Sequence, residues 1–267
     1  MKLSIVLSTQ PASFSALAYK GRLAGNIAKI KSLGYDGVEL AIRDPGSFDL
    51  SALNSLLTKH ALPVPAIGTG QAFGEEGLSF IHPEASIRRK AIDRIKAHMS
   101  LADKLGSIVI IGLVRGKKGP DTSDDQAERW LRAAMTECAS ENRMVKLAIE
   151  PINRYETDLI NTVASGLRLL DAIGLDNVGL LLDTFHMNIE EPSLIGSMIA
   201  ARERLFHFHI ADSNRWYPGA GHIDFAEICN TLSSIGYQGF VSAEILPLPD
   251  PDTAAKKTVE YMRGLAS

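Results

Sequence analysis

The sequence predicts a single (β/α)8 barrel that covers residues 1–267. Short apolar runs of strand length alternate eight times with segments of helical periodicity, and no linker or change of composition separates them. In addition, polar residues close the predicted strands five to eight, and barrels of this kind carry their chemistry at the carboxyl ends of their strands. A chain of 267 residues is a usual length for one such barrel.

The predicted strands are rich in Val, Ile, Leu and Ala, which is typical of strands buried on both faces of a parallel sheet. The first strand is followed by Ser8-Thr9-Gln10-Pro11 rather than by a glycine-rich phosphate turn. This loop disfavours the alternative, an open doubly wound sheet. The eight predicted strands cover residues 2–8, 37–42, 63–67, 107–113, 145–150, 178–182, 205–210 and 240–244.

The predicted helices carry apolar residues at a spacing of three to four. The longest, residues 85–105, also has a run of basic residues, which we interpret as a solvated outer face rather than a phosphate or nucleic-acid site. Residues 71–83 lack periodicity and form a candidate active-site loop. The eight predicted helices cover residues 26–33, 48–60, 85–105, 123–141, 162–173, 193–203, 225–235 and 253–265.

Composition and charge exclude several classes of protein. Hydrophobic residues make up 45% of the chain and charged residues 22%, which are ordinary globular values. A formal net charge of -3 offers no field that would attract a nucleic acid. The chain has no apolar run of about 20 residues and no signal peptide, so we expect a protein without a membrane partner in the cytoplasm. Cys138 and Cys229 fit buried thiols of a reducing compartment.

Four polar residues end successive predicted strands and should meet at one mouth of the barrel. They are Glu150, Asp183, His209 and Glu244. Three carboxylates that converge without compensation repel one another, whereas a divalent cation makes the cluster favourable. Three oxygen ligands and one imidazole suit Mn²⁺, and also Mg²⁺ or Co²⁺, better than a thiol-rich zinc site does.

Three further polar residues follow these strand ends on loops that should surround the mouth. Glu156, His186 and Arg215 each lie a few residues beyond a predicted ligand. The alternatives are a helix-start carboxylate for Glu156, a satisfied polar residue for His186 and a surface cation for Arg215. His207 points to the same side of its strand as His209, one layer deeper, and is interpreted as a core or supporting histidine.

The segments AIEPINRYET, LLDTFHMNIEE, HFHIADSNRWYPGAGHIDF and VSAEILP resemble the metal-dependent ketose 3-epimerases of the xylose isomerase-like barrel superfamily. The resemblance runs the length of the chain, and SIVLST, AIRDP, AIGTGQAF and IIGLVRG are most similar to the 5-keto-L-gluconate epimerase branch. It implies that the four strand-end residues bind the metal and that Glu156, His186 and Arg215 hold the substrate's oxygens. It also implies a homodimer or homotetramer.

These residues fit a physical mechanism for epimerisation. A proton on the carbon beside a ketone is weakly acidic, and a divalent metal that chelates the neighbouring oxygens stabilises the enediolate formed by its removal. Inversion then needs a base on one face and an acid on the other, roles that Glu150 and Glu244 can fill. His186 and Arg215 would stabilise the negative oxygen, and Glu156 would orient the substrate.

The predicted substrate rests on Arg115, which lies two residues past the apolar end of the fourth predicted strand and should overhang the mouth. A guanidinium there could bind a substrate carboxylate, which favours a keto sugar acid such as 5-keto-L-gluconate or D-tagaturonate. The alternative is a surface arginine beside Lys117 and Lys118.

The sequence is also compatible with other functions. They are a ketose 3-epimerase of neutral sugars, an aldose–ketose or hydroxypyruvate isomerase, a zinc endonuclease of DNA repair and a non-catalytic binding barrel. The endonuclease should show more histidine ligands and a basic face.

Overall fold

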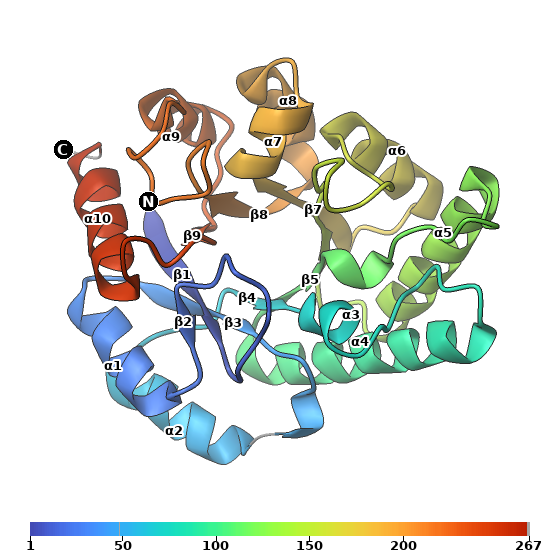
Figure 1. The fold of residues 1–267 in the computed structure, drawn as a ribbon, viewed down its shortest axis with the longest axis horizontal. Coiled ribbons are helices and arrows are strands. Elements are labelled where there is room, and N and C mark those ends of the chain that lie inside the picture. Colours follow the sequence, from blue (N-terminus) through green and yellow to red (C-terminus); the bar gives the residue numbers. More distant parts are fainter. Residues whose placement is uncertain (48, 266–267) are drawn as a thin grey trace.

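The computed structural model describes residues 1–47 and 49–265, and Figure 1 shows a ring of parallel strands surrounded by helices. Strand β1 pairs with both β3 and β9, and this pairing closes the ring. The prediction of a (β/α)8 barrel is therefore confirmed. The strands of the ring are β1 (Lys2–Ser8), β3 (Gly37–Ala41), β4 (Ala66–Gly68), β5 (Ile108–Ile111), β6 (Leu147–Ile149), β7 (Val178–Asp183), β8 (Leu205–Ile210) and β9 (Phe240–Ala243).

The strands differ from the prediction mainly at their ends. Strand β4 begins only at Ala66 because Pro63 and Pro65 have no N–H to donate to a neighbouring strand. Strand β5 ends at Ile111, and a 3₁₀ turn, η2 (Leu113–Arg115), follows. A further short strand, β2 (Tyr19–Lys20), pairs with the end of β1 and is too short to show a periodic pattern.

All eight predicted helices are present, with ends shifted by a few residues. Phe48, at one predicted start, lies outside the described residues. Two additional short helices, α3 (Gln71–Gly74) and α7 (Thr184–Glu190), lie on segments that the sequence pattern left as loops. None of the helices in the described ranges is long and apolar enough to span a membrane. The helices are α1 (Leu23–Ser32), α2 (Leu50–His60), α3 (Gln71–Gly74), α4 (Ala85–Leu105), α5 (Asp124–Glu141), α6 (Val163–Ile173), α7 (Thr184–Glu190), α8 (Leu194–Ala201), α9 (Phe225–Ser234) and α10 (Pro251–Gly264), with 3₁₀ turns η1 (Pro45–Ser47) and η3 (Arg202–Arg204).

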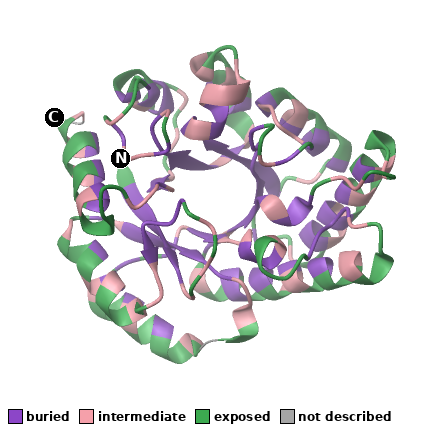
Figure 2. Cartoon of the chain, viewed as in Figure 1, coloured by how far each residue is buried: buried purple, intermediate pink, exposed green. Residues whose placement is uncertain are grey.

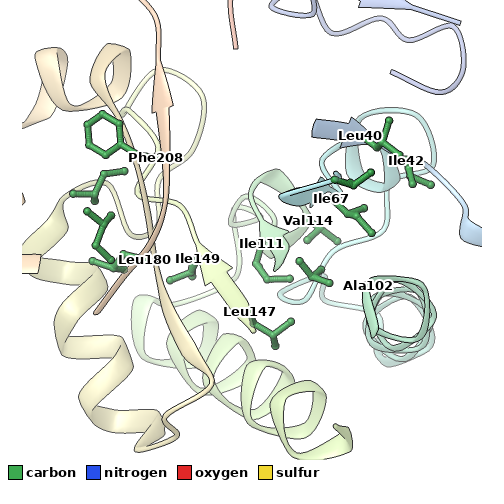
Figure 3. Close-up of a cluster of buried hydrophobic side chains, with 14 of the residues drawn as sticks. Leu40, Ile42, Ile67, Ala102, Ile111, Val114, Leu147, Ile149, Leu180 and Phe208 are labelled. Carbon is green, nitrogen blue, oxygen red and sulfur yellow. The ribbon is translucent and has the colours of Figure 1, made fainter. Parts of the chain in front are cut away.

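The main hydrophobic core lies between the ring of strands and the helices. Figure 3 shows Leu40, Ile67, Ile111 and other strand residues gathered with Ala102 of α4. In Figure 2 the strands are buried almost throughout, whereas the helices expose their outer faces. A fully buried Leu or Ile side chain stabilises the folded protein by about 1.5–3 kcal/mol. The packing of this layer therefore holds each strand in place, and with it the residue at which the strand ends.

The interior of the barrel is apolar on one side and polar on the other. Ala66, Ile110, Ala148 and Leu181 form a small apolar cluster on strands β4 to β7. Buried polar residues occupy strands on the other side, β1, β3, β8 and β9. These residues are Ser4, Ser8, Glu39, His207, His209 and Ser242. The polar half of the interior leads directly to the carboxyl ends of the strands.

A glycine in β7 allows a close approach between neighbouring strands. A Cβ on Gly179 would lie 2.5 Å from ring atoms of Phe206 and 2.7 Å from the Arg204 carbonyl oxygen. We predict that Gly179→Ala lowers the free energy of unfolding by about 1–3 kcal/mol, because backbone and ring must both move. Urea unfolding would measure this change.

The matched control is Gly25→Ala in α1, where a Cβ would meet nothing within 4 Å. Since alanine favours a helix over glycine, this variant should gain about 0.5–1 kcal/mol. Equal stability of the Gly179→Ala variant and the unsubstituted protein would contradict the packing argument.

Candidate active site

A cavity of ≈ 350 Å³ opens at the carboxyl ends of the barrel strands. Its wall includes the strand ends Ala41, Gly68, Glu150, His209 and Glu244. Residues 13–15, 17, 70, 71, 74 and 75 line it as well, so the predicted active-site loop contributes to the wall at its start, where it forms α3. The cavity therefore lies where the sequence placed the mouth.

The structure brings the four predicted metal ligands together, and we call them the carboxylate–histidine cluster. Its members are Glu150, Asp183, His209 and Glu244, and one ligand atom from each lies within 4.8 Å of the others. Register explains part of this arrangement, because Asp183 on β7 is directly opposite His209 on β8. Gly112 leaves room for the cluster, since a Cβ there would lie 3.1 Å from Glu150 Oε2.

Three atoms of this cluster are buried without a hydrogen-bond partner. They are Glu150 Oε1, Asp183 Oδ2 and His209 Nδ1. A buried polar atom without a partner costs about 1–3 kcal/mol, and more if it is charged. Three such atoms in one cluster, each of which offers a lone pair once it is deprotonated, fit a bound cation. The donor set, rich in oxygen with one imidazole, suits Mn²⁺, Mg²⁺ or Co²⁺.

The pKa values of the carboxylates also indicate that this cluster needs added positive charge to stay ionised. Burial raises the pKa of Glu150 well above its usual value, and the charge of Glu244 adds to this shift. Burial also raises the pKa of Glu244 to about 7, although His209 and Arg215 oppose the shift. The pKa of Asp183 is raised by burial too. Without an added positive charge these groups therefore favour protonation, and a divalent cation reverses that balance.

Arg215 forms ion pairs with Glu156 and Glu244 at the mouth of the barrel. Arg215 Nη1 donates to Glu156 Oε1 at 2.8 Å, and Nη2 donates to Glu244 Oε2 at 3.0 Å. The guanidinium also lies over the rings of Phe14 and Phe185, at 5.1 and 4.7 Å from their centroids. Arg215 is buried, so the alternative of a surface cation is wrong.

His186 lies on α7 rather than on a loop, which corrects the expectation from the sequence. The helix begins at Thr184 because Asp183 Oδ1 accepts the Phe185 N–H at 2.8 Å. Asp183 thus both ends a strand and caps a helix of seven residues. Such a short helix shows too little periodicity to be predicted.

The proton of His186 can be placed from its neighbours. Asn153 Oδ1 accepts the Tyr155 N–H, which orients the Asn153 amide so that Nδ2 faces His186 Nδ1 at 2.7 Å and Glu156 Oε1 at 3.0 Å. Burial lowers the pKa of His186 well below its usual value, so the ring is neutral. Because Nδ1 accepts, the proton is on Nε2, which lies 3.7 Å from Glu150 Oε1.

Sequence reasoning missed Glu39 on β3. This buried carboxylate contacts both histidines of β8, with Oε2 2.7 Å from His207 Nε2 and Oε1 3.0 Å from His209 Nε2. Burial opposes ionisation of Glu39, but the two histidines outweigh it and lower its pKa. The same contact overcomes burial at His209 and raises its pKa to about 10. A glutamate inside the apolar run GVELAI was the available signal.

Arg115 does not overhang the mouth, and that expectation is wrong. Its side chain is fully buried, with Nη2 donating to the Glu150 carbonyl oxygen and Nη1 to that of Ile160 at 3.3 Å. The early end of β5 and the turn η2 direct the side chain into the protein instead. Burial lowers the pKa of Arg115 to about 10, against the opposing charges of Glu150 and Glu156.

We predict that Arg115→Met lowers the free energy of unfolding by about 2–4 kcal/mol, because two buried carbonyl groups lose a charged donor. Any loss of turnover should then be proportionally equal on keto sugar acids and neutral ketoses. Thermal unfolding and kcat/KM on both classes would measure this. The control is Lys117→Ala at an exposed position, which should change neither the thermal unfolding nor kcat/KM. A loss confined to keto acids would contradict the structural role.

The fold and the cluster define a (β/α)8 barrel with a candidate divalent-metal centre at its carboxyl mouth. Residues 27–265 match the family described as xylose isomerase-like TIM barrel, and the chain belongs to this family.

Relatives of known activity narrow the class. The chain is 32% identical over 248 residues to L-ribulose 3-epimerase of Methylomonas sp. (strain DH-1), covering 90% of this chain and 84% of the relative. It is 30% identical to 3-dehydro-D-guloside 4-epimerase of Escherichia coli (strain K12), covering 88% and 91%. The crystal structure of D-allulose 3-epimerase from Methylomonas sp. in complex with D-allulose superposes with a TM-score of 0.84 at 27% identity, covering 99% and 96%.

The chain is thus a sugar epimerase of the ketose 3-epimerase family, an isomerase that acts on carbohydrates. The resemblance noted in the sequence is confirmed at this level.

Proposed function

We propose that the protein inverts the carbon next to the ketone of a neutral ketose, with a divalent metal ion, Mn²⁺ in the first instance, bound by the carboxylate–histidine cluster. The observation that carries this proposal is the set of three buried, unpartnered ligand atoms on Glu150, Asp183 and His209. A bound divalent ion supplies positive charge that stabilises the substrate's oxygens as the neighbouring carbon loses its proton.

Glu150 and Glu244 are the proposed acid and base. They follow β6 and β9, which are separated by two strands in the sheet, so their carboxylates can reach one carbon from different sides. One carboxylate removes the proton and the other returns a proton to the opposite face. Burial raises the pKa of both groups, that of Glu244 to about 7, and a bound divalent cation lowers both values again, which favours the ionised carboxylate that removes the proton.

Three other residues hold the substrate in this scheme. His186 presents its Nε2–H, which can donate to a substrate oxygen as negative charge develops there. Arg215 adds a fixed positive charge beside Glu244. Glu156 is fixed by Arg215 and Asn153 and can accept a hydrogen bond from a sugar hydroxyl.

The charges around the cavity favour a neutral sugar over a keto sugar acid. Five glutamates line the cavity: Glu39, Glu75, Glu150, Glu156 and Glu244. Among the lining residues that the structure describes, Arg215 is the one arginine or lysine, and two of its nitrogens are bound to carboxylates. A substrate carboxylate would therefore meet mainly like charges, and the two terminal nitrogens of Arg215 are already bound to Glu156 and Glu244. Arg115, one of the two grounds for a keto acid beside the resemblance to the 5-keto-L-gluconate epimerase branch, is buried away from the cavity.

Removal of metal provides the first test of this proposal. We predict that dialysis against EDTA abolishes epimerisation and that Mn²⁺ or Co²⁺ restores it. Asp183→Asn should weaken Mn²⁺ binding and turnover together, because one ligand loses its charge. Asp176→Asn, on the exposed Asp176–Arg143 ion pair, is the control and should change neither. Full activity in protein shown to be metal-free would disprove a metal-dependent mechanism.

The substrate and the reacting carbon can be found together. Incubation in D₂O with Mn²⁺ and a panel of L-ribulose, D-allulose, D-tagatose and keto sugar acids should place deuterium on the inverted carbon next to the ketone of a neutral ketose. Glu150→Gln and Glu244→Gln variants that still bind Mn²⁺ should lose about 10²-fold or more in rate. Formation of an aldose would instead indicate an aldose–ketose isomerase, and faster turnover of a keto acid would reject the neutral substrate.

A further inference from the structure

One carboxylate, that of Glu39, contacts two histidines across the interior of the barrel. Glu39 is on β3 and the histidines are on β8, and the sheet order β3-β1-β9-β8 places two strands between them. The contacts of 2.7 Å to His207 Nε2 and 3.0 and 3.1 Å to His209 Nε2 therefore cross the interior. All three residues are buried, with 1% exposure each. The contacts thus lie at the floor of the cavity, whose wall includes Glu39 and His209.

These contacts determine what each nitrogen of His209 can do. The carboxylate oxygens of Glu39 accept hydrogen bonds, so His209 Nε2 must carry a proton. The other nitrogen, Nδ1, is buried and has no hydrogen-bond partner. A neutral ring held in this way has its lone pair on Nδ1. An imidazole binds a metal through its unprotonated nitrogen, and the partner of the other nitrogen selects which one that is.

We propose that Glu39 is a positioning residue that fixes the orientation and tautomer of His209, so that Nδ1 is the metal-binding nitrogen. This inference rests on the proposed function and extends it to a residue outside the carboxylate–histidine cluster. His207 has the supporting role, because its Nε2–H holds Glu39 Oε2 in place at 2.7 Å.

The neighbouring groups do not replace this arrangement. Ser4 and Ser242 lie on the same polar side of the barrel, and their hydroxyl oxygens have no hydrogen-bond partner among the described residues. They therefore do not hold the carboxylate. A buried carboxylate is costly unless it is paired, and the two histidine N–H groups are the partners that keep Glu39 ionised. Loss of this charge would leave a weaker acceptor and add a donor at the same place, so the Nε2–H form of His209 would no longer be selected.

The first test measures Mn²⁺ affinity in Glu39→Gln, which keeps the size of the side chain but removes its charge. Electron paramagnetic resonance of free Mn²⁺ should show a Kd about 10- to 100-fold higher than in the unsubstituted protein, the usual effect of losing such a supporting partner. Circular dichroism of the metal-free variant establishes that it is folded. A folded Glu39→Gln variant whose Kd stays within twofold would overturn the proposal.

Ser242→Ala is the matched control. Ser242 is directly opposite His209 in the register of β8 and β9, and it is fully buried. Its removal disturbs the same layer of the barrel without touching the Glu39 contact. The Kd for Mn²⁺ should stay unchanged in this variant. An equal loss of affinity in both variants would show that general packing, and not Glu39, governs the metal site.

A second measurement does not require any variant to fold. In Zn²⁺-loaded wild-type protein with ¹⁵N-labelled histidine, the spectrum should show a protonated Nε2 and an unprotonated Nδ1 for His209. The reverse pattern, or a metal bound by Glu39 itself, would overturn the inference while leaving a metal site in place. Failure of the wild type to bind either Mn²⁺ or Zn²⁺ would instead overturn the proposed function and this inference with it.

Discussion

The constraint on which the mouth of this barrel depends is its excess of buried negative charge. Glu150, Asp183 and Glu244 come from three strand ends into one small space, where burial raises the pKa of each. Arg215 and His209 offset part of this charge but leave carboxylate oxygens without partners. Because an isolated buried carboxylate is expensive, this arrangement supports our proposal of a divalent cation shared by the four side chains.

The fold supports this cluster through contacts that carry no chemistry themselves. The apolar layer between strands and helices fixes where each strand ends, and the side chains just beyond those ends face the cavity. Arg115 holds the backbone of Glu150, Asn153 orients His186, and Glu39 holds His209. Polar residues buried behind the cavity thus serve as supports for the residues that line it.

The sequence predicts the barrel and the cluster because both follow from simple periodic rules. Apolar runs mark the strands, and Glu150 and Glu244 stand out as carboxylates at their ends. The errors have a common physical origin, since they concern where a side chain points. Arg115 is the last residue of the turn η2, which directs its side chain into the protein, and Glu39 makes a contact across the interior with residues 168 and 170 positions away. The oligomeric state and the cytoplasmic location stay predictions.

The most direct test of the metal centre is anomalous X-ray diffraction from crystals soaked in Mn²⁺ and a neutral ketose. The account predicts one strong Mn²⁺ peak within about 2.2 Å of ligand atoms of Glu150, Asp183, His209 and Glu244, with the ketone oxygen of the sugar also bound to it. A peak at Glu39 and His207 instead, or a sugar bound in the cavity of an active crystal without any metal peak, would contradict it.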